Sequence, residues 1–211
     1  MSTYLFDFDG TLVDSMPTYG AVMKRILDEN QVSYGDDIIK IITPLGFRGT
    51  AEYFADTMGV NKSVDELMAT MVRYCTEEYK HNIGEKPHVI ETLMALKLRG
   101  DDLHVLTASP HTSLDPCLKR LGIFELFDNV WSCDDFGTTK ADPEIYRMAA
   151  ERMGRDVNDV IFLDDNYNAD KTAKSAGMTV YGVYDDSSAE YTDEIKSVSD
   201  RYISDFKELL N

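Results

Sequence analysis

The chain has 211 residues, of which 43% are hydrophobic and 28% are charged, a composition typical of folded proteins and not of disordered ones. This length suits one good core, or a core domain with a small inserted domain. The formal net charge is -17. A surface this acidic repels nucleic acid backbones and anionic membranes, so we expect neither as a partner.

Cysteine usage and the N-terminal pattern indicate a compartment. Cys75, Cys117 and Cys133 lie far apart and form no C-x-x-C pair, so we expect reduced thiols, as in a cytosol. The chain shows neither a signal-peptide pattern nor an apolar run of membrane-spanning length. We therefore expect a soluble cytoplasmic protein that is a monomer, or else a dimer.

The first predicted element is a short buried strand at residues 4–6, which ends at the sequence D-F-D-G. Side chains alternate along a strand, so Asp7 and Asp9 can point toward one volume, and Gly10 permits a sharp turn after them. Two carboxylates that share a volume need a cation, and Mg²⁺ commonly bridges such carboxylates to a substrate phosphate. Taken alone, the stretch could equally be an acidic turn without function.

The next part of the chain has a helical pattern. Apolar residues recur at helical spacing from Tyr19 to Tyr74, in sets separated by glycines, and no strand pattern is convincing here. We predict several short helices. Because this segment separates the first strand from all later ones, we predict a small helical domain over residues 15–81, inserted into a core domain of residues 1–14 and 82–211.

From Pro87 onward, strand and helix patterns alternate. We expect strands at residues 103–106, 130–133, 160–163, 179–183 and 201–203, with helices between them and a last helix at 206–210. Such alternation, with connections of this length, predicts an α/β fold: a Rossmann-like parallel sheet with helices on both faces.

Polar residues follow three of the predicted strands. These residues are Asp7 and Asp9, then Thr107 to Ser109, then Asp164 and Asp165. In open parallel sheets, ligands bind at the carboxyl ends of the strands, so we expect these side chains to meet. Lys140 precedes a predicted helix and can reach the same edge. Acids, a hydroxyl and a lysine at one place are what phosphoryl transfer requires.

Four motifs in this order carry a family resemblance. The sequences D-F-D-G-T, L-T-A-S, K-A-D-P-E-I-Y and F-L-D-D-N resemble the motifs of the haloacid dehalogenase superfamily of aspartate-nucleophile phosphotransferases. The helical segment after the first motif is similar to that superfamily's C1-type α-helical cap, so the resemblance covers essentially the whole chain. Within the superfamily, the chain resembles the β-phosphoglucomutase and phosphoglycolate phosphatase-like group.

The resemblance implies a role for each motif residue. Asp7 would attack phosphorus, and Asp9 would protonate the leaving alcohol and then activate water. Thr107 and the Ala108 amide would bind a phosphoryl oxygen, and Lys140 would neutralise the negative charge. The implied Mg²⁺ ligands are Asp7, Asp9 through its backbone carbonyl, Asp165, and Asp164 either directly or through a neighbouring ligand.

The resemblance leaves several activities open. The superfamily's metal-free dehalogenases lack an acid at the position of Asp9, which argues against that reaction. Asp164 is similar to the mutase pattern, but Tyr19 stands where such mutases carry a histidine. We therefore expect a Mg²⁺-dependent phosphatase acting on a small phosphorylated metabolite such as a sugar phosphate, phosphoglycolate or a nucleotide. A β-phosphoglucomutase-like sugar phosphomutase is the alternative, and a non-catalytic phosphometabolite-binding module is the second.

Three further residues have two interpretations each. Arg48 could bind a second anionic group of the substrate or be an ordinary surface arginine. Asp170 could be another acid of the fourth motif or a charge at the start of a helix. His111 could contact substrate or lie in a surface turn.

Overall fold

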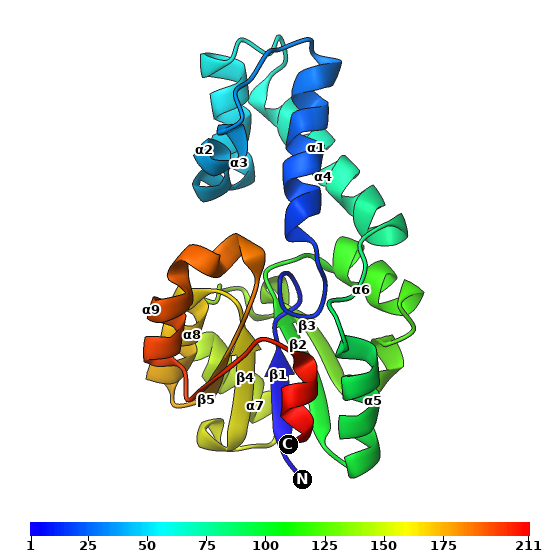
Figure 1. Ribbon diagram of the computed structural model, residues 1–211, viewed down its shortest axis with the longest axis vertical. Coiled ribbons are helices and arrows are strands. Elements are labelled where there is room, and N and C mark those ends of the chain that lie inside the picture. Colours follow the sequence, from blue (N-terminus) through cyan, green and yellow to red (C-terminus); the bar gives the residue numbers. More distant parts are fainter. The chain divides into compact units, whose positions relative to one another are not determined.

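The computed structural model describes residues 1–211, apart from the side chain of Pro44. These residues form two compact units, coloured by sequence in Figure 1. The larger unit contains Met1–Asp14 and Ile83–Asn211, and the smaller unit contains Ser15–Asn82. The chain therefore leaves the larger unit after its first strand and returns to it once.

A parallel sheet of six strands forms the centre of the larger unit (Figure 1). The strands are β1 (Thr3–Phe6), β2 (Asp102–Thr107), β3 (Asn129–Ser132), β4 (Val160–Asp164), β5 (Thr179–Val183) and β6 (Arg201–Ile203). They lie in the order β3-β2-β1-β4-β5-β6, and each neighbouring pair is parallel. β1 is therefore central, and all strands end at the same edge. The predicted α/β fold with a parallel sheet is confirmed.

Helices cover both faces of this sheet. They include α5 (Val89–Arg99), α6 (His111–Arg120), α7 (Glu144–Met153), α8 (Tyr167–Ala176) and α9 (Thr192–Val198). Alternation along β1 sends Leu5 into one core cluster, where it is buried together with Tyr146 of α7. Phe6 points to the opposite face and stacks on Phe206, with 6.1 Å between the ring centroids. The last predicted helix, Phe206–Leu210, is a 3-10 helix.

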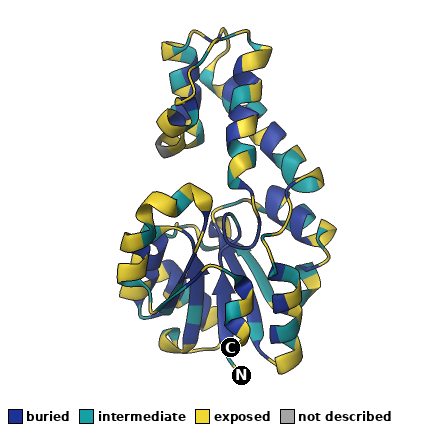
Figure 2. Cartoon of the chain, in the orientation of Figure 1, coloured by how far each residue is buried: buried dark blue, intermediate teal, exposed yellow. Residues whose placement is uncertain are grey.

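The smaller unit is built from helices around a core of its own (Figure 2). Its α-helices are α1 (Met16–Glu29), α2 (Ile38–Ile42), α3 (Gly46–Glu52) and α4 (Val64–His81). Met23, Phe54 and Met71 are fully buried in the core between them. Ser63 and Glu66 form a reciprocal capping box that begins α4. The predicted helical segment between the first and second strands is confirmed.

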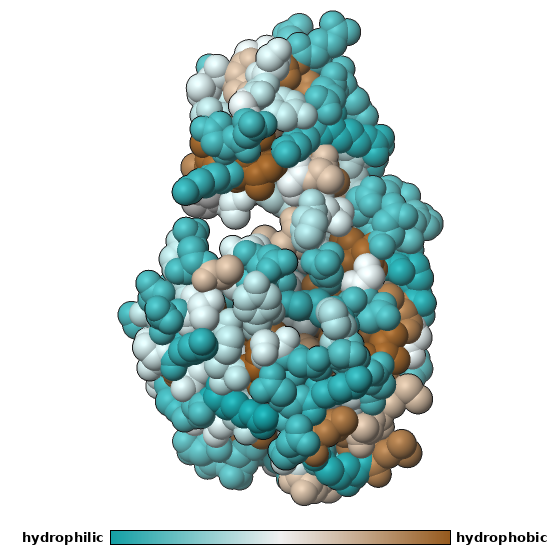
Figure 3. All heavy atoms as spheres, viewed as in Figure 1, coloured by the Kyte–Doolittle hydropathy of each residue, from teal (hydrophilic) through white to brown (hydrophobic). Residues whose placement is uncertain are grey.

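Hydrophilic residues cover most of the face of the molecule seen in Figure 3, in keeping with the net charge of -17. Among the residues that the structure describes, no helix combines the length and apolarity needed to cross a membrane. An anionic ligand that approaches such a surface depends on the cations of its own binding site.

Candidate active site

Three buried carboxylates meet where β1 and β4 end. Because these strands pair in parallel, Asp7, which follows β1, lies beside Asp164, the last residue of β4. The backbone N–H of Asp7 donates to the carbonyl of Leu163 at 2.8 Å, which continues the pairing by one residue. Carboxylate oxygens of Asp7, Asp164 and Asp165 lie within 4.8 Å of one another. These carboxylates belong to residues that are only 5%, 1% and 8% exposed.

Lys140 lies against this cluster. Its Nζ donates to Oδ1 of Asp7 and, at 2.8 Å, to Oδ2 of Asp164. The backbone carbonyl of Lys140 accepts a hydrogen bond from the hydroxyl of Tyr146 at 3.2 Å, so the loop before α7 is anchored to that helix. Burial alone would lower the pKa of Lys140, but the charges of Asp164 and Asp7 outweigh it and hold the pKa well above its usual value. Lys140 is therefore a cation.

One ammonium group does not balance three buried carboxylates. Burial raises the pKa of Asp7 well above its usual value, and the nearby acids add to this shift while Lys140 opposes it. Burial, followed by the charges of Asp164 and Asp185, raises the pKa of Asp165 to about 8. A further cation would offset the repulsion between these carboxylates and favour their charged forms. Carboxylate oxygens are the donors that hard divalent ions such as Mg²⁺ prefer. The cluster thus fits a divalent metal ion.

The carboxylate of Asp9 is not part of this cluster. Ser109 Oγ donates to Oδ2 of Asp9 at 2.6 Å, and the backbone N–H of Ser109 donates to Thr107 Oγ1 at 3.0 Å. Thr107 is buried at the end of β2, and Ala108 follows it as an exposed residue. The first and second motifs are therefore joined by a direct contact between Asp9 and Ser109.

Arg48, a predicted site residue, and Tyr19, which stands where the mutases carry a histidine, lie in the smaller unit. Arg48 is on α3, where its side chain is 66% exposed and forms ion pairs with Glu52 at 3.8 Å and with Asp65 at 3.9 Å. The hydroxyl of Tyr19 lies 3.2 Å from Oγ1 of Thr50. Arg48 is thus an exposed arginine whose two ion pairs are long.

Asp170 and His111 have well-defined surroundings. Asp170 is fully buried in the first turn of α8, where Ser199 Oγ approaches its Oδ2 at 3.5 Å. Among the described residues, its Oδ1 has no hydrogen-bond partner. His111 lies between two carboxylates, with Asp115 at 2.7 Å and Asp135 at 2.8 Å. The hydrogen bond to Asp115 is the main reason why the pKa of His111 is raised.

Sequence reasoning missed a lysine next to the acidic cluster. Lys86 Nζ donates to the carbonyls of Gly10 and Tyr184, both at 2.5 Å, and to Asp185 Oδ2 at 2.8 Å. Asp185 comes two residues after the end of β5, so the strand-end rule applied to the other strands would have found it. Lys86 lies in an ordinary polar stretch, and no pattern distinguishes it.

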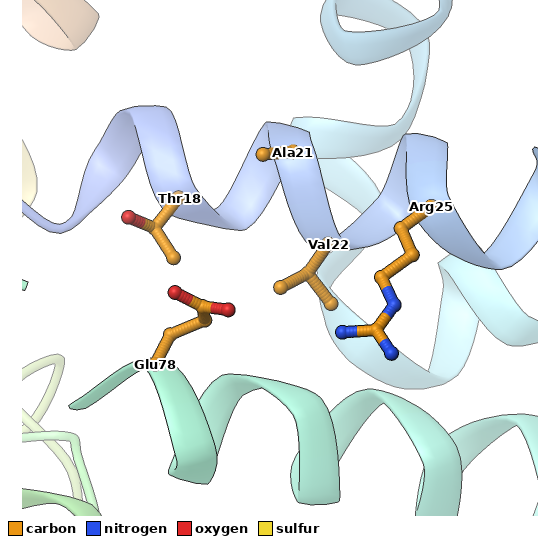
Figure 4. Close-up of a pocket in the computed structure, with 5 residues that line it drawn as sticks. All are labelled: Thr18, Ala21, Val22, Arg25 and Glu78. Carbon is orange, nitrogen blue, oxygen red and sulfur yellow. The ribbon is translucent and has the colours of Figure 1, made fainter. Parts of the chain in front are cut away.

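A shallow pocket of about 140 Å³ lies in the smaller unit between α1 and α4 (Figure 4). Its lining residues are Thr18, Ala21, Val22, Arg25 and Glu78. The guanidinium of Arg25 is held by Glu29 at 2.9 Å and lies over the ring of Tyr74. None of the predicted site residues lines this pocket, and its one cation is already paired, so we assign no role to it.

Comparison with known proteins extends over most of the chain. Residues 4–183 match the family model described as haloacid dehalogenase-like hydrolase. The chain is 32% identical over 184 residues to pyrophosphatase PpaX of Bacillus velezensis, covering 87% of this chain and 83% of that protein. It is 29% identical over 199 residues to the phosphoglycolate phosphatase of Escherichia coli K12, covering 84% and 79% respectively.

A solved structure shows the same fold. A Thermotoga maritima protein crystallised as a candidate β-phosphoglucomutase matches with a TM-score of 0.85 at 24% identity, over 100% of this chain and 97% of that one. The family model and the similarity to PpaX extend the agreement from fold to sequence. This chain belongs to the family of haloacid dehalogenase-like hydrolases.

Proposed function

We propose that this hydrolase is a Mg²⁺-dependent phosphatase that cleaves a small phosphate monoester through an aspartyl-phosphate intermediate. The observation that carries the proposal is the contact of Lys140 with Asp7 and Asp164 inside the buried acidic cluster. A lysine that bridges two carboxylates leaves a nucleophile and a charge-neutralising cation side by side, which is what transfer of a phosphoryl group needs.

The reaction would have two steps. In the first, an oxygen of Asp7 forms a bond to phosphorus, the bond from phosphorus to the leaving oxygen breaks, and Asp9 gives that oxygen a proton. In the second, Asp9 takes a proton from water, whose oxygen attacks the phosphorus of the aspartyl-phosphate. Inorganic phosphate leaves and Asp7 is regenerated. The hydrogen bond from Ser109 would hold the carboxylate of Asp9 in place during both proton transfers.

The remaining roles follow from position and charge. Thr107 and the Ala108 amide would bind oxygens of the phosphoryl group at the end of β2, and Lys140 would neutralise them. The metal ion would be held by Asp7, Asp164 and Asp165, together with the backbone carbonyl of Asp9. A bound Mg²⁺ supplies positive charge to the carboxylates and to the phosphoryl oxygens.

The smaller unit would select the substrate. We infer that residues 15–81 act as a cap domain that chooses the leaving group, with residues 1–14 and 82–211 as the catalytic core domain. Arg48 is the residue we propose for a second anionic group on the substrate, because its existing ion pairs are long and exposed. The named activities of PpaX and of the E. coli relative, on pyrophosphate and on phosphoglycolate, make those two compounds the first to test.

The test is release of phosphate from a panel containing pyrophosphate, phosphoglycolate, sugar phosphates, nucleotides and p-nitrophenyl phosphate, with Mg²⁺ and with chelator. We expect Mg²⁺-dependent release from one compound class, abolished in Asp7→Asn and unchanged in Asp36→Asn, which alters an exposed acid of the smaller unit. Isomerisation of a sugar phosphate that requires a sugar bisphosphate activator would support the mutase instead. Binding without turnover would support the binding module.

A further inference from the structure

Lys86 occupies a partly buried position between two loops of the larger unit. Its side chain is 13% exposed, and that of its partner Asp185 is 6% exposed. An ammonium group has three N–H donors. Here they are taken by the carbonyl of Gly10 in the loop after β1, and by the carbonyl of Tyr184 and the carboxylate of Asp185 in the loop after β5. Lys86 therefore ties these two loops together.

The loop that Lys86 holds is in contact with Asp165. Gly10 has a φ of +76°, and a Cβ at this position would lie 2.6 Å from Oδ2 of Asp165, so the backbone of Gly10 forms a wall against that carboxylate. The next residue, Thr11, donates from Oγ1 to Oδ1 of Asp165 at 3.2 Å. The position of the Gly10–Thr11 loop thus decides where the carboxylate of Asp165 can lie.

The backbone around Lys86 is fixed as well. Its N–H donates to the carbonyl of Leu12 at 3.0 Å, and Val13 forms a bridge with Glu85. Asp185 is held in turn by the backbone N–H of Ser187 at 2.9 Å and by the hydroxyl of the same residue at 2.6 Å. Burial would raise the pKa of Asp185, but the hydrogen bonds from Lys86 and Ser187 outweigh it and lower the pKa. Lys86 and Asp185 therefore form an ion pair in which each residue is held by further hydrogen bonds.

We propose that Lys86 is a positioning residue for the metal site: by tying the carbonyl of Gly10 to the loop after β5, it sets the position of Asp165 and thereby the affinity of the acidic cluster for a divalent cation. The inference rests on the proposed function only in taking that cluster as a cation site. Residues that orient metal ligands without touching the ion typically change metal affinity by about 10-fold to 100-fold. Lys86 would act in this way through Gly10 and Thr11.

The test is titration of the protein with Mn²⁺ in the absence of substrate, with free Mn²⁺ measured by electron paramagnetic resonance. We expect Lys86→Met to raise the dissociation constant by about 10-fold or more. The matched control is Lys171→Met, which changes an exposed lysine of the same unit and should leave the constant unchanged. If the proposed function also holds, the variant should need more Mg²⁺ for half-maximal phosphate release, while kcat at saturating Mg²⁺ and KM for the substrate stay close to their original values.

A second variant distinguishes weakened metal binding from a defect in folding. Lys86→Met leaves Asp185 as a buried charge without its cation, whereas the double variant Lys86→Met with Asp185→Asn removes both charges. Both should show weakened Mn²⁺ binding, with folding checked by circular dichroism. Mn²⁺ binding within twofold of the original protein in a folded Lys86 variant would overturn the inference alone. A failure of the original protein to bind Mn²⁺ would overturn both this inference and the proposed metal-dependent function.

Discussion

At the scale of single residues, the pairing of Lys140 with the carboxylates of Asp7 and Asp164 takes charged groups out of water. The partly buried lysine and the buried acids each lose hydration, and each is stabilised as an ion by the charge of the other. Removal of either partner therefore leaves the charge of the other partner without compensation. The same contact that stabilises the cluster also places a cation next to the proposed nucleophile, so stability and chemistry depend on the same side chain.

Replacement of Lys140 tests this dependence. In Lys140→Met the negative charge on Asp7 and on the transferring oxygens would no longer be neutralised, and we expect kcat for phosphate release to fall by about 100-fold to 1,000-fold. The measurement is steady-state phosphate release at saturating Mg²⁺ on the best substrate of the panel. Lys171→Met should retain the original rate. Full activity in Lys140→Met would show that Lys140 has no catalytic role.

Asp170 affects stability through its proton. Burial, with smaller contributions from Asp164 and Asp165, raises the pKa of Asp170 to about 9. The unfolded chain would lose this proton near pH 4, as an ordinary aspartic acid does at about 3.9. Between these values the folded state holds one more proton than the unfolded state, so the free energy of unfolding falls as the pH rises.

The variant Asp170→Asn removes this titration and keeps the size of the side chain. Relative to the original protein, its free energy of unfolding should therefore increase with pH, by up to about 1.4 kcal/mol per pH unit between roughly pH 5 and pH 8. Urea unfolding at several pH values measures this difference, with chelator present so that no metal ion neutralises Asp164 and Asp165. A difference that does not change with pH would mean that Asp170 is ionised in the folded protein.

At the scale of elements, the side chain of Asp165 constrains the loop after β1. Gly10 adopts a φ of +76°, and Asp165 fills the space where a side chain would begin. Gly154, which follows α7, has a φ of +67° but no atom within 4 Å of the position of its missing Cβ. The two glycines share a left-handed backbone, and they differ in whether a carboxylate lies next to them.

This pair of glycines separates backbone strain from displacement of Asp165. Gly154→Ala should lower the free energy of unfolding by about 1 to 2 kcal/mol, the cost of a left-handed alanine, and retain full activity. Gly10→Ala should incur the same cost and, because its Cβ displaces Asp165, also lose Mg²⁺-dependent phosphate release. Chemical denaturation and phosphate release would be measured on both variants. Equal activity in the two would show that contact with Gly10 does not matter for the site.

At the scale of the whole molecule, the net charge of -17 opposes the approach of an anionic substrate. Salt screens this repulsion, because the Debye length falls from about 30 Å at 0.01 M to about 8 Å at 0.15 M. We therefore expect kcat/KM for an anionic substrate to rise severalfold over this range of KCl, with kcat unchanged. The control is p-nitrophenyl phosphate, which should respond less than phosphoglycolate, because phosphoglycolate carries a carboxylate in addition to its phosphate. A fall in kcat/KM with salt would indicate that local cations dominate the approach.

Particular strands show which bounds could be predicted from the local sequence and which depend on pairing with a neighbouring strand. β5 and β6 have the bounds predicted for them, at 179–183 and 201–203, although β6 is the short sequence R-Y-I, in which only Ile203 is buried. β3 begins one residue earlier than predicted, at Asn129, because pairing with β2 decides where it starts. The order of the strands follows from packing and could not be derived from local patterns.

What the sequence by itself determined is the type of fold and the proximity of Lys140 to the acidic cluster. Strand ends, chain order and motif spacing are local properties, and they were enough to predict that Asp7, Lys140, Asp164 and Asp165 lie near one another, as the structure shows. Only the tertiary structure decided that the carboxylate of Asp9 is bound by Ser109, and that Lys86 is bound to Asp185. Asp9 and Ser109 are 100 residues apart in the chain, and Lys86 and Asp185 are 99 apart. Such partners are chosen by how the loops pack at one edge of the sheet, and no periodicity in the chain records that choice.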